Sequence, residues 1–212
     1  MRVFGRGSIF LLTSVLASFV VIGGERPDSA DTWNGLMLDE STVEDAVAAL
    51  GRPQKDKADQ KLTTTVSNWL DREARFRKLE YKKVAGVDHA NFYFLDDHLK
   101  VIEIDLKHPF VAAELPLYYD LRYFFKDDSG ILRPDPFDSG LEGYRRGEFP
   151  STFHVIGVGD SSFLVAFIAH QGVSRMLYEQ TGVRSDVPGS VQVIQLISRL
   201  LQGSDVPDRL GR

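Results

Sequence analysis

The sequence of 212 residues contains no cysteine. No disulfide can form and no cysteine is present to carry a lipid anchor, so an apolar core alone must hold the fold together. Hydrophobic residues make up 43% of the chain and charged residues 26%, which is the composition of a globular protein and not of a disordered one. The length is sufficient for one sizeable core or two small ones.

The chain also lacks an excess of positive charge. Its formal net charge is −5, and the densest basic stretch, residues 72–83, is interleaved or flanked by Asp71, Glu73 and Glu80. Binding to nucleic acid requires a continuous basic stripe, whereas mixed charges of this kind are typical of a solvated face. We therefore expect no nucleic-acid partner.

Recognisable sites for metals and cofactors are missing as well. No phosphate-binding glycine loop or dinucleotide fingerprint occurs, and no histidine lies three or four residues from another. The five histidines are His89, His98, His108, His154 and His170. The stretches 88–89 and 96–98 could share an ion only if they lay at the same end of a sheet; two exposed polar turns are the alternative. The sequence thus predicts no metal, no cofactor and no catalytic residue.

One string resembles the way a known family presents a catalytic nucleophile. Residues 154–163, HVIGVGDSSF, resemble the start of the serine hydrolases named for their Gly-Asp-Ser-Leu motif. Such an enzyme needs a base and an oriented acid downstream, yet the only histidine after Ser161 is His170, with no Asp-x-x-His motif. A hairpin turn also requires Gly, Asp and Ser, and it is the favoured interpretation. The hydrolase interpretation predicts that His154 or His170 contacts the Ser161 hydroxyl.

Residues 1–24 have the outline of a secretory signal. Arg2 and Arg6 precede an uncharged run from Gly7 to Gly24, which ends in small residues that offer a cleavage point. The run also approaches the roughly 18 residues that begin to span a bilayer, so an uncleaved N-terminal anchor is the alternative. We expect an exported protein, periplasmic or extracellular, that meets a membrane only through this segment. Cleavage would change the formal net charge from −5 to −7, because two arginines and no acid would be lost.

The stretch LDESTVEDAVAALGRPQ, residues 38–54, predicts a short helix. Ser41 and Glu44 have the spacing of a capping box, and Gly51 followed by Pro53 ends the helix. The apolar positions that form one stripe are Val43, Val47 and Leu50. The helix is therefore expected to pack on a neighbouring element.

The region that follows predicts one more helix and then strands. After a charged connection at residues 54–61, residues 62–76 are interpreted as a second helix, with an irregular threonine-rich strand as the alternative. Ile102, Ile104 and Leu106 alternate with charged residues, which is typical of an antiparallel strand with one wet face. Three such runs, KLEYKKV, NFYFL and LKVIEIDL, predict a meander.

Aromatic side chains crowd residues 118–125. At helical spacing these side chains lie on two faces, so they either wedge between two sheets or form a surface for a partner. The residues taken as candidates for an interaction or ligand surface are Trp69, Tyr118, Tyr119, Tyr123 and Phe125.

The C-terminal part predicts a second β-region. Residues 131–150 are rich in proline and glycine and are expected to form a loop, and residues 152–158 and 163–169 form an apolar hairpin. Residues 191–201 suit a strand at their start and a helix at their end. We expect residues 204–212 to be a frayed tail.

The order of three features carries a resemblance to a known family. These features are Gly35, then the capped helix STVEDAVAALGRP, then three strands ending in DDHLKVIEIDL. This order resembles the two-helix, three-strand repeat of the small outer-membrane lipoprotein family and of the related β-lactamase inhibitory protein fold. Residues 50–53 match the Leu-Gly-x-Pro signature of that helix, and the resemblance covers residues 33–106. It implies a helical pair across one face of an antiparallel sheet and a role in binding other proteins in a cell envelope.

These observations predict an α+β protein: a linker at 25–32, a helix-helix-meander unit at 33–130 and a hairpin-based extension at 151–203. The predicted function is an exported, non-catalytic interaction module of the bacterial cell envelope, with another protein as its partner. The first alternative is a protein that binds a small apolar ligand in an aromatic-lined pocket, and the second is a hydrolase at Ser161. A deep cavity lined by Tyr119, Tyr123 and Phe125 would favour the ligand.

Overall fold

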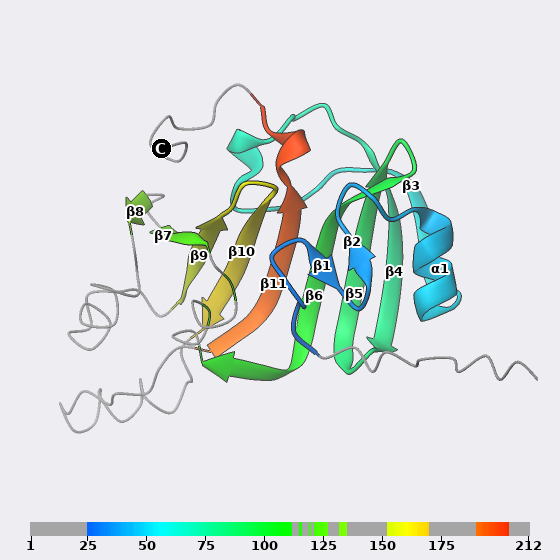
Figure 1. The fold of residues 1–212 in the computed structure, drawn as a ribbon, viewed down its shortest axis with the longest axis horizontal. Coiled ribbons are helices and arrows are strands. Elements are labelled where there is room, and N and C mark those ends of the chain that lie inside the picture. The colour runs from blue at the N-terminus through cyan, green and yellow to red at the C-terminus, as the bar shows by residue number, and fades with distance from the viewer. Residues whose placement is uncertain are drawn as a thin grey trace, which may run out of the picture.

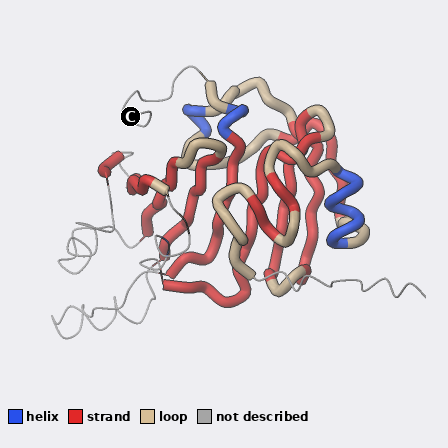
Figure 2. Tube along the Cα trace, viewed as in Figure 1, coloured by secondary structure: helices blue, strands red, loops and turns tan. Residues whose placement is uncertain are grey.

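The structure is a computed structural model, and most of what it describes is β-strand. It describes residues 25–111, 115, 119, 121–126, 132–134, 152–169 and 190–203. Strands dominate these residues, and the helical segments are short (Figure 2). The predicted leader and the predicted C-terminal tail lie outside the described residues.

One antiparallel sheet of nine strands forms the body of the protein (Figure 1). The strands are β3 (Lys55–Gln60), β4 (Phe76–Val84), β5 (Val87–Leu95), β6 (His98–Val111), β7 (Arg122–Lys126), β8 (Leu132–Pro134), β9 (Thr152–Val158), β10 (Ser162–Ala169) and β11 (Ser190–Ser198). Their order across the sheet is β3-β4-β5-β6-β11-β10-β9-β7-β8. The last strand in the chain, β11, therefore lies in the middle of the sheet, between β6 and β10.

The N-terminal segment covers one face of this sheet. A small hairpin of β1 (Thr32–Trp33) and β2 (Leu36–Met37) lies over the central strands, in front of the sheet in Figure 1. Trp33 is fully buried beneath it, and its ring centroid lies 5.8 Å from that of Phe92. The helix α1 (Val43–Leu50) follows at the side of the sheet that carries β3 and β4. We call the face of the sheet that the β1-β2 hairpin covers the hairpin face.

The opposite face, which we call the open face, is crossed by the connection between β3 and β4. This connection contains the 3₁₀ helix η1 (Ser67–Trp69), and the chain after β11 forms a second one, η3 (Arg199–Leu201). Trp69 packs on the sheet with its ring centroid 5.9 Å from that of Phe163. The two connections are joined where Leu70 bridges Gln202. A second buried cluster therefore lies beneath this crossing segment.

The predicted α+β arrangement with a helical pair on one face is wrong. α1 is the one α-helix whose bounds fall within the described residues, in which Leu115 is also helical, and residues 62–76 contain one 3₁₀ turn instead of a second helix. The three consecutive threonines at 63–65 have low helix propensity. Val66, Trp69 and Leu70 are all buried because this connection runs across the sheet and anchors itself there. Tertiary contacts therefore decide its conformation, and the two-helix arrangement implied by the resemblance is not observed.

The predicted first helix is present, but its cap lies one residue later than expected. Thr42 is the N-cap, and it forms a capping box with Asp45 in place of Ser41 with Glu44. Thr42 is held extended by a bridge to His98 of β6, which fixes where the helix can begin. The buried positions are Val43 and Ala46, whereas Val47 of the predicted stripe is 39% exposed.

Several strand predictions are confirmed in detail. The meander is β4-β5-β6, and the C-terminal hairpin is β9-β10. Residues 190–198 are a strand and residues 199–201 a 3₁₀ helix. The strand pattern at the start of residues 191–201 and the helical pattern at their end are therefore both confirmed. The charged stretch 54–61 was predicted as a connection, but it contains the edge strand β3, where one side of the backbone faces solvent and an apolar alternation is not required.

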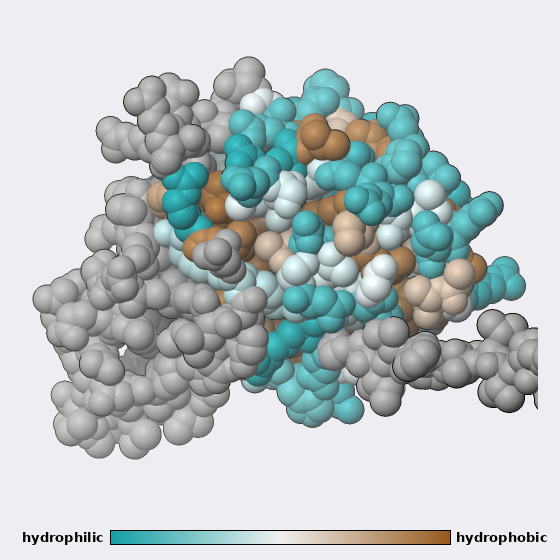
Figure 3. Space-filling view, viewed as in Figure 1, coloured by the Kyte–Doolittle hydropathy of each residue, from teal (hydrophilic) through white to brown (hydrophobic). Residues whose placement is uncertain are grey.

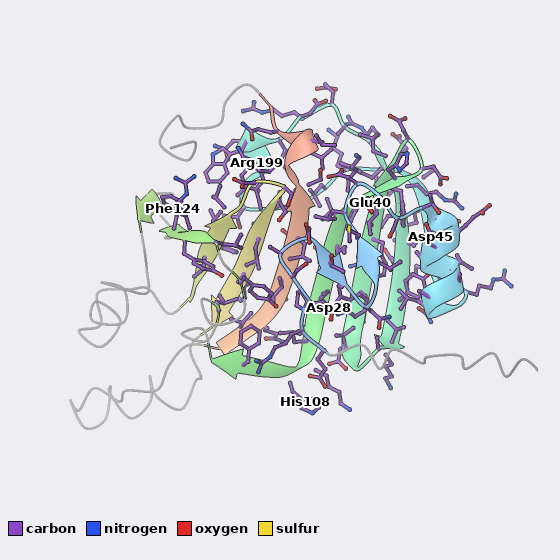
Figure 4. The ribbon with its side chains drawn as sticks, viewed as in Figure 1. Asp28, Glu40, Asp45, His108, Phe124 and Arg199 are labelled. Carbon is purple, nitrogen blue, oxygen red and sulfur yellow. The ribbon has the colours of Figure 1, made fainter. Side chains whose placement is uncertain are left out.

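Residues 25–32, predicted as a linker, pack against the sheet. The Glu25 carboxylate lies 2.6 Å from Nδ1 of His108, at the lower end of the sheet in Figure 4. The Tyr119 hydroxyl donates to the carbonyl oxygen of Pro27 at 3.0 Å. The packed region therefore includes this segment.

Candidate functional site

A pocket of about 440 Å³ lies on the open face, turned away from the viewer in Figure 1. Pockets of roughly 300–1,000 Å³ are the size that small-molecule ligands occupy. The lining residues are Thr63, Thr64, Thr65, His154, Val165, Phe167, Val193 and Gln195. They come from residues 63–65, the β9-β10 hairpin and β11, which lie apart in the sequence, so the pocket exists only in the folded chain.

The floor of the pocket is built from the central strands β10 and β11. Val165 pairs with Gln195 in the register, and Phe167 pairs with Val193. Because alternate residues of a strand point to the same side, all four share the open face. His154 of β9 pairs with Phe167 in turn, and their ring centroids lie 5.2 Å apart. The floor is thus mostly apolar, with one amide and one imidazole at its edges.

The wall of the pocket is the threonine stretch at residues 63–65. Val66 and Trp69, which follow it, are buried against the sheet and hold the wall in place. Nε2 of Gln195 also donates to the carbonyl oxygen of Thr63 at 3.0 Å, which ties the wall to the floor. Hydroxyl and backbone groups therefore face an apolar floor across the pocket.

A chain of polar side chains extends from the pocket across three strands. Nε2 of Gln195 makes its second hydrogen bond to Oε2 of Glu103 in β6, at 2.6 Å. Oε1 of Glu103 accepts from Nδ2 of Asn91 in β5, also at 2.6 Å. Charge-assisted bonds of this length are among the stronger ones in proteins, so they fix the position of the Gln195 amide.

Beyond Asn91 the same row ends in a cluster of lysines around Glu80. Nζ of Lys57 lies 2.8 Å from Oε1 of Glu80, and Nζ of Lys78 lies 3.2 Å from the same oxygen. Lys55 lies 3.6 Å from Oε2. The hydrogen bond from Lys57, together with Lys78, lowers the pKa of Glu80 from 4.5 to about 2. Burial and the neighbouring charges of Glu103 and Glu80 raise the pKa of Tyr93 on this face.

We expect Glu80→Gln to destabilise the protein by about 1 kcal/mol at pH 7, since two of the three lysines around Glu80, Lys57 and Lys55, are 41% and 57% exposed and are screened by water. A carboxyl whose pKa is lowered by folding stabilises above its unfolded pKa, and that contribution disappears as the pH falls from about 4.5 to about 2. Urea unfolding at several pH values measures the difference between wild type and variant. Glu73→Gln is the control, because Glu73 is 89% exposed. A difference that stayed constant down to pH 2 would contradict the assignment.

A smaller hollow of about 140 Å³ lies on the other side of the threonine wall. Thr64 lines both hollows, so the wall is a thin partition between them. The smaller hollow is bordered by Leu62, Phe76 and Leu201. Its volume lies below the roughly 300–1,000 Å³ of pockets that hold drug-sized ligands.

The candidate surface residues named from the sequence do not line the pocket. Trp69, Tyr119 and Tyr123 are 4%, 3% and 7% exposed and lie in the packed interior. The Tyr123 hydroxyl donates to the carbonyl oxygen of Tyr119 at 3.1 Å, as expected for a buried phenol that needs a partner. Tyr118 lies outside the described residues, and Phe125 is placed only by its backbone in β7. The observed pocket is therefore not the aromatic-lined pocket that the sequence offered as an alternative.

The structure places Ser161 in the turn between β9 and β10, as the hairpin interpretation predicts. Its hydroxyl donates to Oδ2 of Asp31 at 3.2 Å, and hydrogen bonds from Ser29 and other hydroxyls lower the pKa of Asp31. His154 lies toward the far end of the hairpin, paired with Phe167, and His170 is outside the described residues. Ser161 thus helps to attach the N-terminal segment to the hairpin.

The two stretches that could have shared an ion lie at opposite ends of β5. Residues 88–89 are at its start, and residues 96–98 follow its end. Across the described residues no group of three or more metal-binding side chains comes together. No helix in the same part of the chain has the length and apolar character needed to span a bilayer.

Sequence reasoning missed Gln195, although the sequence holds a signal for it. The stretch VQVIQLI is apolar except for two glutamines, and Gln195 lies between Val193 and Ile197 on a buried face. A single amide in such a position requires hydrogen-bond partners and marks a place where the core is interrupted. Its partners Thr63 and Glu103 could not be found without the fold.

No family model, curated protein or solved structure matches this chain.

Proposed function

We propose that this protein is a non-catalytic binding protein that holds a small molecule with an apolar body in the pocket on its open face. The observation that carries the proposal is the pocket itself, about 440 Å³ with Val165, Phe167 and Val193 as an apolar floor. Ligand sites typically combine such a floor with a few fixed polar groups, here Gln195 and the threonine wall. The amide of Gln195 and its neighbours Glu103 and Asn91 are engaged in structural hydrogen bonds, which suits a fixed binding group.

The rest of the described surface gives less support to a large protein interface. Only three large hydrophobic residues are exposed in the described part of the chain: Met37, Val47 and Leu200. On the hairpin face, brown areas are interrupted by hydrophilic ones (Figure 3). The edge strand β3 carries lysines and aspartates, which discourage pairing with another strand. A protein partner stays a prediction, as does the envelope location; the mass of the protein recovered from its native host tests whether residues 1–24 are removed.

Binding of N-phenyl-1-naphthylamine tests the proposal, because this uncharged aromatic amine fluoresces more strongly in an apolar site. We expect saturable binding to the full chain with a Kd on the order of 10 µM, given its size and a pocket open on one side. Val193→Trp should weaken binding at least tenfold, because the larger side chain fills the floor of the pocket. Fluorescence titration measures both affinities.

Val47→Trp is the matched control for this experiment. It makes the same change at a 39% exposed position on α1, away from the pocket lining. Circular dichroism and thermal unfolding establish that both variants are folded. The proposal fails if the probe does not bind saturably, or if Val193→Trp and Val47→Trp bind it equally well.

A further inference from the structure

The Gln195 amide presents only one kind of polar group to the pocket. Its Nε2 donates to the carbonyl oxygen of Thr63 and to the Glu103 carboxylate. Both partners can only accept, so the amide cannot be turned around without losing both bonds. Both hydrogens of Nε2 are therefore used, and the polar atom left for a ligand is the carbonyl oxygen Oε1, a hydrogen-bond acceptor.

The charged side chains of β6 beside the pocket are acidic, and negative charge favours a ligand group that donates hydrogen bonds. Glu103 pairs with Gln195 across β6 and β11, and Asp105 pairs with Val193 of the pocket floor. Both acids point to the open face, where Asp105 lies 3.6 Å from Nδ1 of His89. Three lysines, Lys55, Lys57 and Lys78, contact Glu80 farther along the sheet, and Lys82 pairs with His89, one strand beyond Asp105. Two carboxylates of β6 therefore lie next to the strand that carries Gln195.

We infer that the pocket selects molecules whose polar end donates hydrogen bonds, best a protonated primary amine, over molecules with the same apolar body and a carboxylate end. This inference rests on the proposed function and names the ligand class for it. An ammonium group can donate to Oε1 of Gln195 and is attracted by Glu103 and Asp105. A carboxylate would face an acceptor that is fixed in place and two like charges, and only the threonine hydroxyls and the His154 imidazole would be left to replace its hydration. The threonine hydroxyls can donate or accept, so they do not decide the preference.

Displacement of bound N-phenyl-1-naphthylamine by n-octylamine and by octanoate tests the inference. The two chains have matching apolar length and differ in the polar end. At pH 7 and 0.15 M salt, where long-range effects of the net charge are screened, we expect octylamine to displace the probe at least tenfold more strongly than octanoate. The comparison uses the full chain, and isothermal titration calorimetry of octylamine gives the same affinity without the probe.

Two variants assign the preference to the pocket. Glu103→Gln keeps an acceptor for the Gln195 amide and removes one charge, so the preference for octylamine over octanoate should fall to less than threefold. Gln195→Leu should also reduce the preference, because it removes the Oε1 acceptor. Asp59→Asn is the control: it removes one charge at the exposed β3 edge, where the Asp59 side chain is 83% exposed, and should leave the preference unchanged.

The outcomes separate the two proposals. If the probe binds but octanoate displaces it as well as octylamine does, the inference is overturned and the binding function stands. The inference also fails if Asp59→Asn reduces the preference as much as Glu103→Gln, because net charge alone would then explain it. If the probe does not bind at all, both fall together.

Discussion

Replacing Trp33 with alanine will lower the free energy of unfolding by about 3–5 kcal/mol, the range for removing a fully buried large aromatic residue. Trp33 has no exposed surface and lies beneath the β1-β2 hairpin, against Phe92. Its removal leaves a cavity between the hairpin and the sheet, which adds to the cost of losing the buried side chain. Urea unfolding followed by circular dichroism measures the change.

Trp33→Phe separates packing from hydrogen bonding at this site. Nε1 of Trp33 is buried and has no hydrogen-bond partner, so phenylalanine loses volume and no hydrogen bond; we expect a loss of only about 1–2 kcal/mol. Met37→Ala in the same hairpin should cost less than about 1 kcal/mol, because Met37 is 38% exposed. If Trp33→Ala cost no more than Met37→Ala, the hairpin would not be packed as described.

Asp39→Ala is expected to cost about 3–4 kcal/mol. The Asp39 carboxylate accepts from Nζ of Lys100 at 2.6 Å and from the hydroxyl of Ser198 at 2.7 Å, so it fastens the N-terminal segment to both β6 and β11. Hydrogen bonds to a charged group contribute about 1.5–3 kcal/mol. Asp39 also has a φ of +66°, a conformation that alanine adopts at a cost of about 1 kcal/mol. Urea unfolding at pH 7 gives the total.

Two controls divide this effect. Asp97 has a φ of +65° in an exposed turn, so Asp97→Ala measures the backbone contribution without the clamp. Asp39→Asn tolerates the left-handed conformation and keeps one acceptor, so it should cost about 1–2 kcal/mol. Equal losses for Asp39→Ala and Asp97→Ala would show that the clamp contributes nothing.

The elements that the sequence predicted correctly are those whose signal is local. The alternation at residues 102–106 marked β6, and the Gly-Asp-Ser-Ser turn at 159–162 marked the β9-β10 hairpin. The edge strand β3 was missed because its residues are exposed and carry no alternation. The prediction of a helix over residues 62–76 was wrong because the buried residues of this segment are spaced to contact the sheet beneath them and do not follow a helical period.

The pocket could not be predicted, because its parts meet only through pairings of distant segments. Thr63 and Gln195 are hydrogen bonded although 132 residues separate them in the sequence. The pairing of β11 with β6 has no local sequence signal, and it is this pairing that places Gln195 beside Glu103. Tyr119 and Tyr123 were interpreted either as buried between sheets or as a surface, and both are buried; local crowding of aromatics does not reveal that the N-terminal segment contacts Tyr119.

The central position of β11 sets the order in which the chain can complete its sheet during synthesis. Until residues 190–198 have left the ribosome, β6 and β10 each present an unpaired edge, and the two halves of the sheet have no strand between them. Pairings between distant segments form slowly, and unpaired edges invite aggregation. A nascent chain of this protein therefore depends on its last strand to join the two halves, and synthesis that stalls before residue 190 leaves two open half-sheets.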